Sequence, residues 1–253
     1  MSLILGDCVD EMKKLPDQMI DLTVTSPPYD NLRGYSPLPF EKFQDVAREL
    51  YRITKPRGVI VWVVADATVN GSETGTSYRQ ALFFKDMGFN LHDTMIWRKN
   101  QGSPFQHANR YISDFEFMFV LSKGSPKTHE LIRDRKNKWA GHAMHGTDRN
   151  SDNSTKPKSG IEAGRKVREF GARFNVWEIT PHMSRVIKTH PAIFPEQLAA
   201  DHIETWSRPG DMVLDPFLGS GTTGKMAKAL GREFIGIEID PAYLEIAKAR
   251  ISA

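Results

Sequence analysis

Three glycines near the carboxyl end of the chain stand between an aspartate and a glutamate, in a pattern that could hold a nucleotide. Residues 211–214 predict a short buried strand, 222–230 a helix and 233–239 a second strand. The aspartate, Asp215, lies at the tip of the first strand, and Gly219, Gly221 and Gly224 follow it. Glycines let the backbone approach a ligand closely, and the start of the helix offers free N–H groups. A strand, turn, helix and strand in this order are typical of a nucleotide-binding unit.

The glycine loop fits three ligand classes by pattern alone. The G-x-G-x-x-G spacing, with Glu238 at the distance expected of a ribose-binding acid, is that of a dinucleotide site. The stretch from Gly219 to Lys225 also matches the start of a phosphate-binding P-loop, although Met226 has no hydroxyl to place on Mg²⁺. The third class is S-adenosylmethionine. Asp215 favours this one, because a carboxylate there would repel pyrophosphate and attract an ammonium and a sulfonium.

A second chemical stretch, Ser26-Pro27-Pro28-Tyr29, follows a predicted strand at 20–25. Two prolines cannot extend a central strand, so the chain must turn out at the end of that strand. Ligand sites of open α/β sheets lie at such carboxyl ends. We therefore expect this tetrapeptide and the glycine loop to share one site.

The two stretches together resemble the amino-group DNA methyltransferases, which methylate exocyclic nitrogens of adenine or cytosine. The catalytic tetrapeptide comes first and the cofactor loop last, an order similar to the beta class, and the resemblance covers nearly the whole chain apart from roughly residues 125–175. It implies a single Rossmann-like α/β domain over residues 1–253. That domain would have a mostly parallel doubly wound sheet, an antiparallel edge from residues 91–98 and 115–121, and its catalytic half before its cofactor half.

The resemblance also implies roles for individual residues. The catalytic residues would be Ser26, Pro27, Pro28 and Tyr29. The residues binding S-adenosylmethionine would be Asp7, Cys8, His190, Phe194, Pro195, Asp215, Pro216, Phe217, Gly219, Ser220, Gly221, Thr222, Thr223, Glu238 and Ile239. Asp7 would accept a hydrogen bond from the adenine amino group, or would cap the short helix that follows it, which is a common use of aspartate.

The expected chemistry is direct methyl transfer to an exocyclic amine of a flipped base. Ser26 Oγ and the Pro27 carbonyl would accept hydrogens of the amine, and the two prolines add no N–H donor beside them. Tyr29 would stack on the base. Serine at the first position goes mostly with cytosine N4 in the resembled family, whereas aspartate or asparagine goes mostly with adenine N6. We therefore expect N4-methylcytosine, with N6-methyladenine as the alternative.

Four other functions remain open at the level of sequence. A dehydrogenase would use the glycine pattern but would leave the tetrapeptide without a role. A P-loop ATPase lacks the metal-binding hydroxyl. Methyltransferases of RNA or of protein amides use similar tetrapeptides. A catalytically inactive DNA-binding module would keep only the basic surface.

Composition indicates one globular α/β protein. The chain has 253 residues, 40% of them hydrophobic and 26% charged. No apolar run reaches the ~20 residues of a membrane span, and the N-terminus shows no signal-peptide pattern. The single cysteine, Cys8, cannot form an internal disulfide. These features favour a cytoplasmic protein.

The positive charge is concentrated in one segment. Residues 123–188 contain 15 Lys+Arg against 7 Asp+Glu, a balance of +8, whereas the rest of the chain carries 19 against 24, or −5. We interpret 123–175 as a basic insert that recognises DNA, against the alternative of a solvated loop. The DNA-binding candidates are Arg33, Arg133, Arg135, Lys136, Lys138, Arg165, Lys166 and Arg168. His142 and His145 lie in the insert without a ligand cluster, so we expect no metal site.

The expected partner is double-stranded DNA, and a cognate restriction endonuclease could act beside the protein. The pattern is compatible with a monomer or a homodimer. It does not give the recognition sequence, because base-edge contacts come from loops whose shape is not encoded locally.

The basic insert should make DNA affinity strongly dependent on salt. Each phosphate contact releases counterions and adds roughly 0.9 to the slope of log affinity against log salt. Replacing four of the basic candidates in 133–168 with glutamine should therefore weaken DNA binding and flatten that slope, while S-adenosylmethionine affinity stays unchanged. Fluorescence anisotropy with a labelled duplex between 50 and 200 mM salt measures both the DNA affinity and its salt slope. An unaltered slope would mean that the insert does not contact phosphates.

Overall fold

The computed structural model describes residues 1–28, 38–100, 109–161, 164–181 and 195–252. Tyr29, Arg33, His190 and Phe194, which the sequence assigned to the site, lie outside the described residues. The chain forms two compact units. We call Met1–Glu130 with Asn175–Ala253 the main unit, and Leu131–Phe174 the insert unit.

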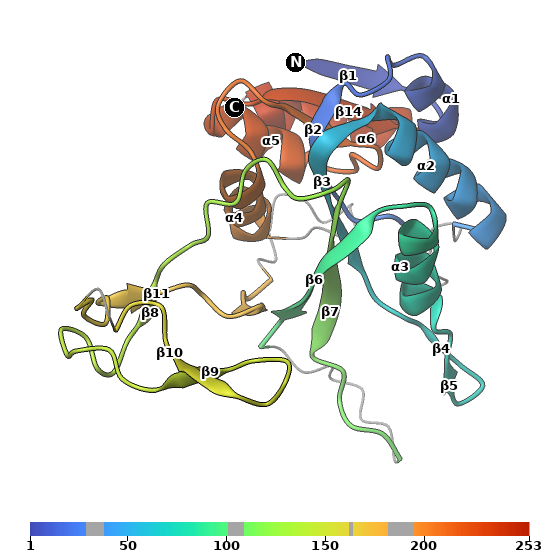
Figure 1. Ribbon diagram of the computed structural model, residues 1–253. Helices are drawn as coiled ribbons and strands as arrows, with labels where there is room; N and C mark the ends of the chain where they lie inside the picture. The colour runs from blue at the N-terminus through green and yellow to red at the C-terminus, as the bar shows by residue number, and fades with distance from the viewer. Residues whose placement is uncertain (29–37, 101–108, 162–163, 182–194, 253) are drawn as a thin grey trace. The chain divides into compact units, whose positions relative to one another are not determined.

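The described part of the main unit is built on an eight-stranded sheet. In sheet order the strands are β1 (Ser2–Leu5), β14 (Glu233–Glu238), β13 (Met212–Asp215), β2 (Ile20–Thr25), β3 (Thr54–Val64), β7 (Phe115–Ser122), β6 (Asn90–Arg98) and β12 (Val176–Glu178). Neighbouring strands are parallel from β1 to β3, β7 is antiparallel to both of its neighbours, and β12 is parallel to β6. Figure 1 shows the blue N-terminal strand β1 beside the red C-terminal elements.

Helices cover both faces of this sheet and define two cores. The helices of the first core are α1 (Cys8–Lys13), α2 (Phe40–Ile53) and α3 (Thr76–Asp86). Those of the second are α4 (Glu196–Trp206), α5 (Thr222–Ala229) and α6 (Pro241–Ser252). In β3, Ile60 and Trp62 enter the first core and Val61 and Val63 the second, which is why an uninterrupted apolar run predicted this strand. The fold is therefore the doubly wound α/β arrangement expected from the sequence.

The structure differs from the sequence-based expectation at the sheet edge. The antiparallel pair β6 and β7 forms as predicted, but β12 adds outside it and becomes the edge strand. Residues 66–75, expected to be a loop, contain a small hairpin of β4 (Thr68–Val69) and β5 (Ser72–Glu73). The strands β4 and β5 have two residues each, too few for a periodicity to be recognised, and the sequence of the three-residue β12 does not specify which strand it pairs with.

The insert unit consists of loops with short strand pairs. Its strands are β8 (Arg135–Lys136), β9 (Thr147–Arg149), β10 (Thr155–Pro157) and β11 (Phe170–Gly171), with β8 pairing β11 and β9 pairing β10. Asp134 and Arg173 form an ion pair of 2.6 Å within it. This segment has little apolar periodicity, and polar contacts of this kind hold it together in place of a large core.

None of the helices in the described ranges is long and apolar enough to cross a membrane. This agrees with the sequence, which contains no apolar run of that length.

A pair of glycine variants separates backbone strain from crowding. Gly221 has a φ of +80°, and an added Cβ would lie 2.9 Å from the Ala247 Cβ. Gly210 has a φ of +84° with open space around it. The left-handed conformation costs an alanine roughly 1–2 kcal/mol, and overpacking adds roughly 1–3 kcal/mol. We expect Gly210→Ala to lower the free energy of unfolding by the first amount only, and Gly221→Ala to lower it by the sum of both. Denaturant unfolding measures each loss. Equal losses would mean that α6 shifts away from Gly221 without resistance.

Candidate active site

The chain reverses its winding direction between β13 and β2. From β13 it passes through α5 to β14 on one side, and from β2 it passes through α2 to β3 on the other. These two helices lie on opposite faces of the sheet, since α5 contributes to the second core and α2 to the first. Such a switch point opens a crevice at the carboxyl ends of the strands, where ligands of α/β proteins bind.

The tips of β13 and β2 are joined by side-chain hydrogen bonds. The ladder between the strands pairs Leu214 with Thr23, and beyond it Thr25 Oγ1 donates to Asp215 Oδ1 at 2.6 Å. Thr223 Oγ1, from the first turn of α5, donates to the Val24 carbonyl at 3.1 Å. Both hydroxyl groups are buried. The end of β2, immediately before the predicted catalytic tetrapeptide, is therefore in direct contact with the predicted cofactor stretch.

Asp215 is a buried carboxylate with few compensating donors. Its side chain is 2% exposed, and the Phe217 N–H donates to Oδ1 at 3.1 Å in addition to Thr25. Burial raises the pKa of Asp215 to about 6 from 3.8, although the hydrogen bonds of Thr25 and Phe217 lower it. A carboxylate in this state is stabilised by any cationic group that enters the crevice.

Glu238 lies at the tip of β14, on the other side of β13, and organises the glycine loop. Its Oε2 accepts from the Gly219 N–H at 2.7 Å and its Oε1 from the Asp240 N–H at 2.9 Å. Each carboxylate oxygen has a second lone-pair site, so these bonds leave acceptor capacity for ligand hydroxyls. Ile239 follows it with its side chain 67% exposed.

The glycine loop requires left-handed backbone at Gly219 and Gly221, with φ of +51° and +80°. Gly221 is the N-cap of α5 and provides no side-chain cap, so the first-turn N–H groups of α5 are available to a ligand. Gly224 serves packing, because an added Cβ would lie 2.6 Å from Ile251 Cδ1. Ser220 and Thr222 are buried at this turn.

The lysine of the P-loop pattern is engaged elsewhere. Lys225 Nζ donates to Glu196 Oε1 at 2.7 Å. A phosphate at the loop would also face the buried Asp215 carboxylate. The geometry therefore does not support the ATPase alternative.

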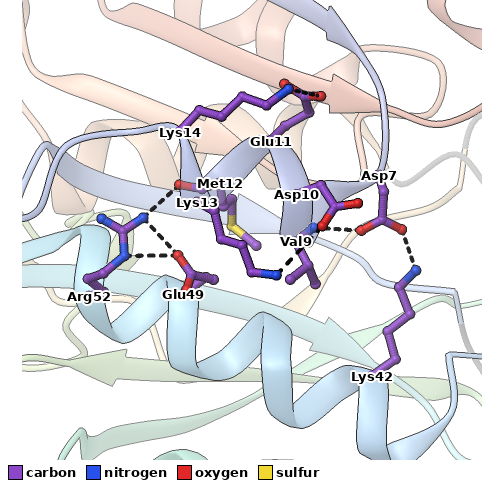
Figure 2. A network of polar contacts seen from close by, with 10 residues as sticks. All are labelled: Asp7, Val9, Asp10, Glu11, Met12, Lys13, Lys14, Lys42, Glu49 and Arg52. Atoms are coloured by element: carbon purple, nitrogen blue, oxygen red, sulfur yellow. Dashed lines mark hydrogen bonds and ion pairs between the residues drawn. The ribbon is translucent and has the colours of Figure 1, made fainter.

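Asp7 caps α1 and contacts a lysine that sequence reasoning missed. Its Oδ1 accepts from the Val9 N–H at 2.9 Å, and its Oδ2 is paired with Lys42 Nζ of α2 (Figure 2). Burial is the largest single influence and raises the pKa of Asp7, but the hydrogen bonds from Lys42 and the Val9 N–H, together with the positive charge of Lys42, outweigh it, and the net shift is downward. The Gly6 N–H donates to the Glu238 carbonyl at 2.9 Å, which places Asp7 beside the tip of β14.

Cys8 is a buried thiol rather than a reactive one. It is 6% exposed, and burial, followed by the charge of Asp7, raises the pKa of Cys8 to about 12. This agrees with its expected character as a small buried residue.

The remaining predicted residues that the structure describes in the main unit follow strands or precede a helix. Ser26, Pro27 and Pro28 follow β2 directly, with Pro27 buried and the other two partly buried. Pro195 precedes α4 as its N-cap, one position before the first helical position suggested by its sequence. Pro216 and Phe217 continue from Asp215, and Phe217 packs against Trp62 at 6.2 Å between ring centroids.

Two charged residues beside the glycine loop, Arg250 and Glu196, were not among the site residues predicted from the sequence. Arg250 of α6 donates to the Ser220 carbonyl, the Ser220 hydroxyl and Glu196. No local pattern in the sequence distinguishes Arg250 from the other basic residues of its helix.

The predicted DNA-binding residues are mostly exposed in the insert unit. Arg135 is the exception: its side chain donates to the Ala172 carbonyl at 3.0 Å and covers the Phe174 ring at 4.8 Å. The exposed ones are Arg133, Lys136, Lys138, Arg165, Lys166 and Arg168.

The raised pKa of Asp215 predicts a pH dependence of stability. The folded state holds the Asp215 proton more tightly than the unfolded state, so this contribution is complete below pH 3.8 and lost as pH rises through about 6. The free energy of unfolding of the wild type minus that of Asp215→Asn should therefore fall by roughly 3 kcal/mol over this interval and remain constant above it. Urea unfolding of both proteins at several pH values measures it. A difference that does not change with pH would contradict the burial of an ionisable carboxyl.

Comparison with known proteins agrees with this geometry. A family model described as DNA methylase matches residues 20–249. The orphan methyltransferase M.BamHII of Bacillus amyloliquefaciens is 51% identical over 254 residues, which cover 98% of this chain and 90% of that protein.

Two solved structures share the fold. The PvuII DNA methyltransferase (cytosine-N4-specific) matches with a TM-score of 0.72 and 22% identity, over 98% of this chain and 85% of that one. The complex of M1.HpyAVI with S-adenosylmethionine matches with a TM-score of 0.65 and 24% identity, over 100% and 99%. The chain therefore belongs to the DNA methylase family that modifies exocyclic N4 or N6 amino groups, with S-adenosylmethionine as cofactor and DNA as substrate.

Proposed function

We propose that this protein transfers a methyl group from S-adenosylmethionine to the exocyclic N4 of cytosine in duplex DNA. The observation that carries the proposal is the hydrogen bond of 2.6 Å between Thr25 and Asp215. Ser26 follows Thr25 directly, which supports its proposed role as a neutral hydroxyl acceptor next to the cofactor loop.

The side chains at the crevice fit S-adenosylmethionine. The cofactor contains an ammonium, a sulfonium, ribose hydroxyls and a flat adenine. Asp215 supplies the buried negative charge for the cationic groups, and Glu238 has acceptor capacity for the hydroxyls. The exposed side chain of Ile239 offers an apolar surface to the heterocycle. The other proposed contacts come from Asp7, Cys8, Pro195, Pro216, Phe217, Gly219, Ser220, Gly221, Thr222 and Thr223, with His190 and Phe194 carried over from the family resemblance.

The target amine needs acceptors that direct its lone pair. An exocyclic amine is a weak nucleophile because its lone pair is delocalised into the ring. Acceptance of its two hydrogens by Ser26 Oγ and the Pro27 carbonyl favours a tetrahedral nitrogen, and Pro27 and Pro28 have no N–H to oppose this. S-adenosylmethionine supplies the electrophilic methyl group. The methylated amine then loses one proton to solvent water.

A covalent route to 5-methylcytosine is disfavoured by the only thiol. Attack on cytosine C6 needs a thiolate. Cys8 is buried, and its pKa is raised to about 12, so it stays protonated at neutral pH. Direct transfer to an exocyclic nitrogen requires no protein nucleophile.

The choice between cytosine and adenine rests on Ser26. A serine hydroxyl is shorter and neutral, whereas the aspartate common in adenine enzymes of this family carries a charge. Cytosine N3 is also a stronger acceptor than adenine N1, which suits a tetrapeptide whose first side chain is not a carboxylate. N6-methyladenine is the second candidate product, and it would leave the enzyme class unchanged.

We propose the insert unit as the surface that meets DNA. Six of its predicted basic residues are exposed, and Trp139, 61% exposed, has Lys138 Nζ at 5.7 Å from its ring. Exposed cations beside an aromatic ring suit both phosphates and unpaired bases. We keep Arg33 and Tyr29 as proposed contacts of the DNA and of the flipped base. Modification of a short specific sequence, with or without a cognate endonuclease, is the biological role we infer.

The product identifies the target base. The protein is incubated with S-adenosylmethionine and plasmid DNA, and the digested nucleosides are compared with three methylated standards by mass spectrometry. N4-methylcytosine is the expected product. N6-methyladenine would overturn the cytosine assignment, and 5-methylcytosine would refute the direct-transfer mechanism.

Ser26→Ala should lower kcat roughly 10- to 100-fold, the equivalent of one strong hydrogen bond at about 1.5–3 kcal/mol. Its affinity for S-adenosylmethionine, measured by calorimetry, should stay within about twofold of the wild type, because the bond matters mainly in the transition state. Ser2→Ala, at the exposed start of β1, is the matched control and should behave as wild type. A full-rate Ser26→Ala enzyme would remove Ser26 from the mechanism.

A further inference from the structure

One guanidinium connects the closing helix to the glycine loop. Arg250 Nη1 donates to the Ser220 carbonyl at 2.7 Å, to Ser220 Oγ at 2.7 Å and to Thr222 Oγ1 at 3.2 Å. The Arg250 side chain is only 17% exposed, so these bonds are partly shielded from water. A planar guanidinium with several fixed donors is suited to holding more than one acceptor at once.

The other side of the same guanidinium meets the first residue of α4. Arg250 Nη2 lies 3.0 Å from Glu196 Oε1, and Lys225 Nζ of α5 lies 2.7 Å from the same oxygen. Glu196 therefore joins cations from two helices. The three residues, Glu196, Lys225 and Arg250, are called the ion triad below. The triad links the starts of α4 and α5 with the last turn of α6.

Glu238 holds the start of the glycine loop through the Gly219 N–H, whereas Arg250 supplies the side-chain bonds to Ser220. Gly219 and Gly221 give up more conformational freedom on ordering than other residues, and Gly221 leaves α5 without a side-chain cap. A loop that fluctuates must be ordered when a ligand binds, which reduces affinity. Arg250 holds both the carbonyl and the hydroxyl of Ser220, between the two glycines, and so opposes this fluctuation from outside the crevice.

We propose that Arg250, with Glu196 as its counter-charge, is a positioning residue that presets the glycine loop for S-adenosylmethionine. The inference rests on the proposed role of this loop in holding the cofactor, and it adds a residue that no motif of the loop contains. Arg250 acts through Ser220 and Thr222. Its donors are directed to protein acceptors, and a cation would repel the sulfonium if it faced the ligand.

A purely structural role makes a different prediction. If Arg250 only fastened α6 to the domain, its loss would lower global stability without a specific change at the loop. Lys248, two residues away on α6, forms an exposed pair with Glu245 at 2.7 Å, and it makes no hydrogen bond to the glycine loop among the described residues. Lys248→Gln is therefore the matched control for removing one positive charge from this helix.

The test compares Arg250→Gln, Arg250→Lys, Glu196→Gln and Lys248→Gln with the wild type. Calorimetry gives the Kd for S-adenosylmethionine, and hydrogen exchange of the cofactor-free protein reports on peptides spanning residues 216–225. We expect Arg250→Gln to raise Kd and KM for the cofactor about 10-fold, to leave kcat within about twofold, and to speed exchange in those peptides. Arg250→Lys should recover part of the affinity, because one ammonium can serve the loop or Glu196 but not both.

Glu196→Gln keeps the bonds of Arg250 to the loop and removes its counter-charge, so its Kd should rise by about threefold. Wild-type Kd and exchange in Arg250→Gln would overturn the proposal, as would equal changes in Lys248→Gln. If Arg250→Gln does not fold, a wild-type Kd in Glu196→Gln overturns it as well. Asp215→Asn is measured alongside: unchanged cofactor binding in that variant would instead refute the proposed role of the loop.

Discussion

The hydrogen bond between Thr25 and Asp215 joins two segments that lie 190 residues apart in the sequence. It forms just beyond the point where backbone pairing of β2 and β13 ends, and the bond from Thr223 to the Val24 carbonyl reinforces it. Without these bonds the two strand tips would be free to separate. These side-chain bonds extend the contact between the two strands beyond the end of their backbone pairing. They therefore keep the start of the tetrapeptide close to the glycine loop.

Burial of the Asp215 carboxylate costs the folded protein solvation free energy. An ionised carboxylate in this position is poorly solvated, which raises its pKa to about 6. The protein without a ligand is therefore less stable at neutral pH than it would be with a neutral side chain. A cationic ligand would pair with this buried carboxylate and offset its desolvation. The free energy recovered in this way would add to the affinity for the ligand. Functional sites commonly hold groups whose pKa is displaced in this way.

Charge is divided between the two units in the way that their proposed roles require. The carboxyl edge of the main sheet presents Asp215 and Glu238, which suit the cationic and hydroxyl groups of the cofactor. The insert unit presents exposed arginines and lysines, which suit a polyanion. Beside the glycine loop the local charge is positive: Arg250 bonds both Ser220 and Glu196, and Lys225 bonds the same Glu196 oxygen.

The sequence by itself determined the elements and the two chemical stretches. Glu196–Trp206 is a helix as predicted, and β3 was recognisable, because apolar periodicity and proline or glycine boundaries are local signals. The doubly wound order was implied by the family resemblance of the two stretches, and the sheet order confirms it. Identification of the loop ligand needed both stretches, since Gly219 and Gly221 alone fit three classes.

Only the tertiary structure decided which side chains meet. The Thr25–Asp215 bond, the Asp7–Lys42 pair and the ion triad each join residues from different elements. The edge position of β12 and the β4–β5 hairpin were also decided there, by pairing rather than by composition. The physical reason is that hydrogen bonds and ion pairs depend on distances of about 3 Å. The one-dimensional pattern fixes periodicity within an element, and the packing of elements sets these distances.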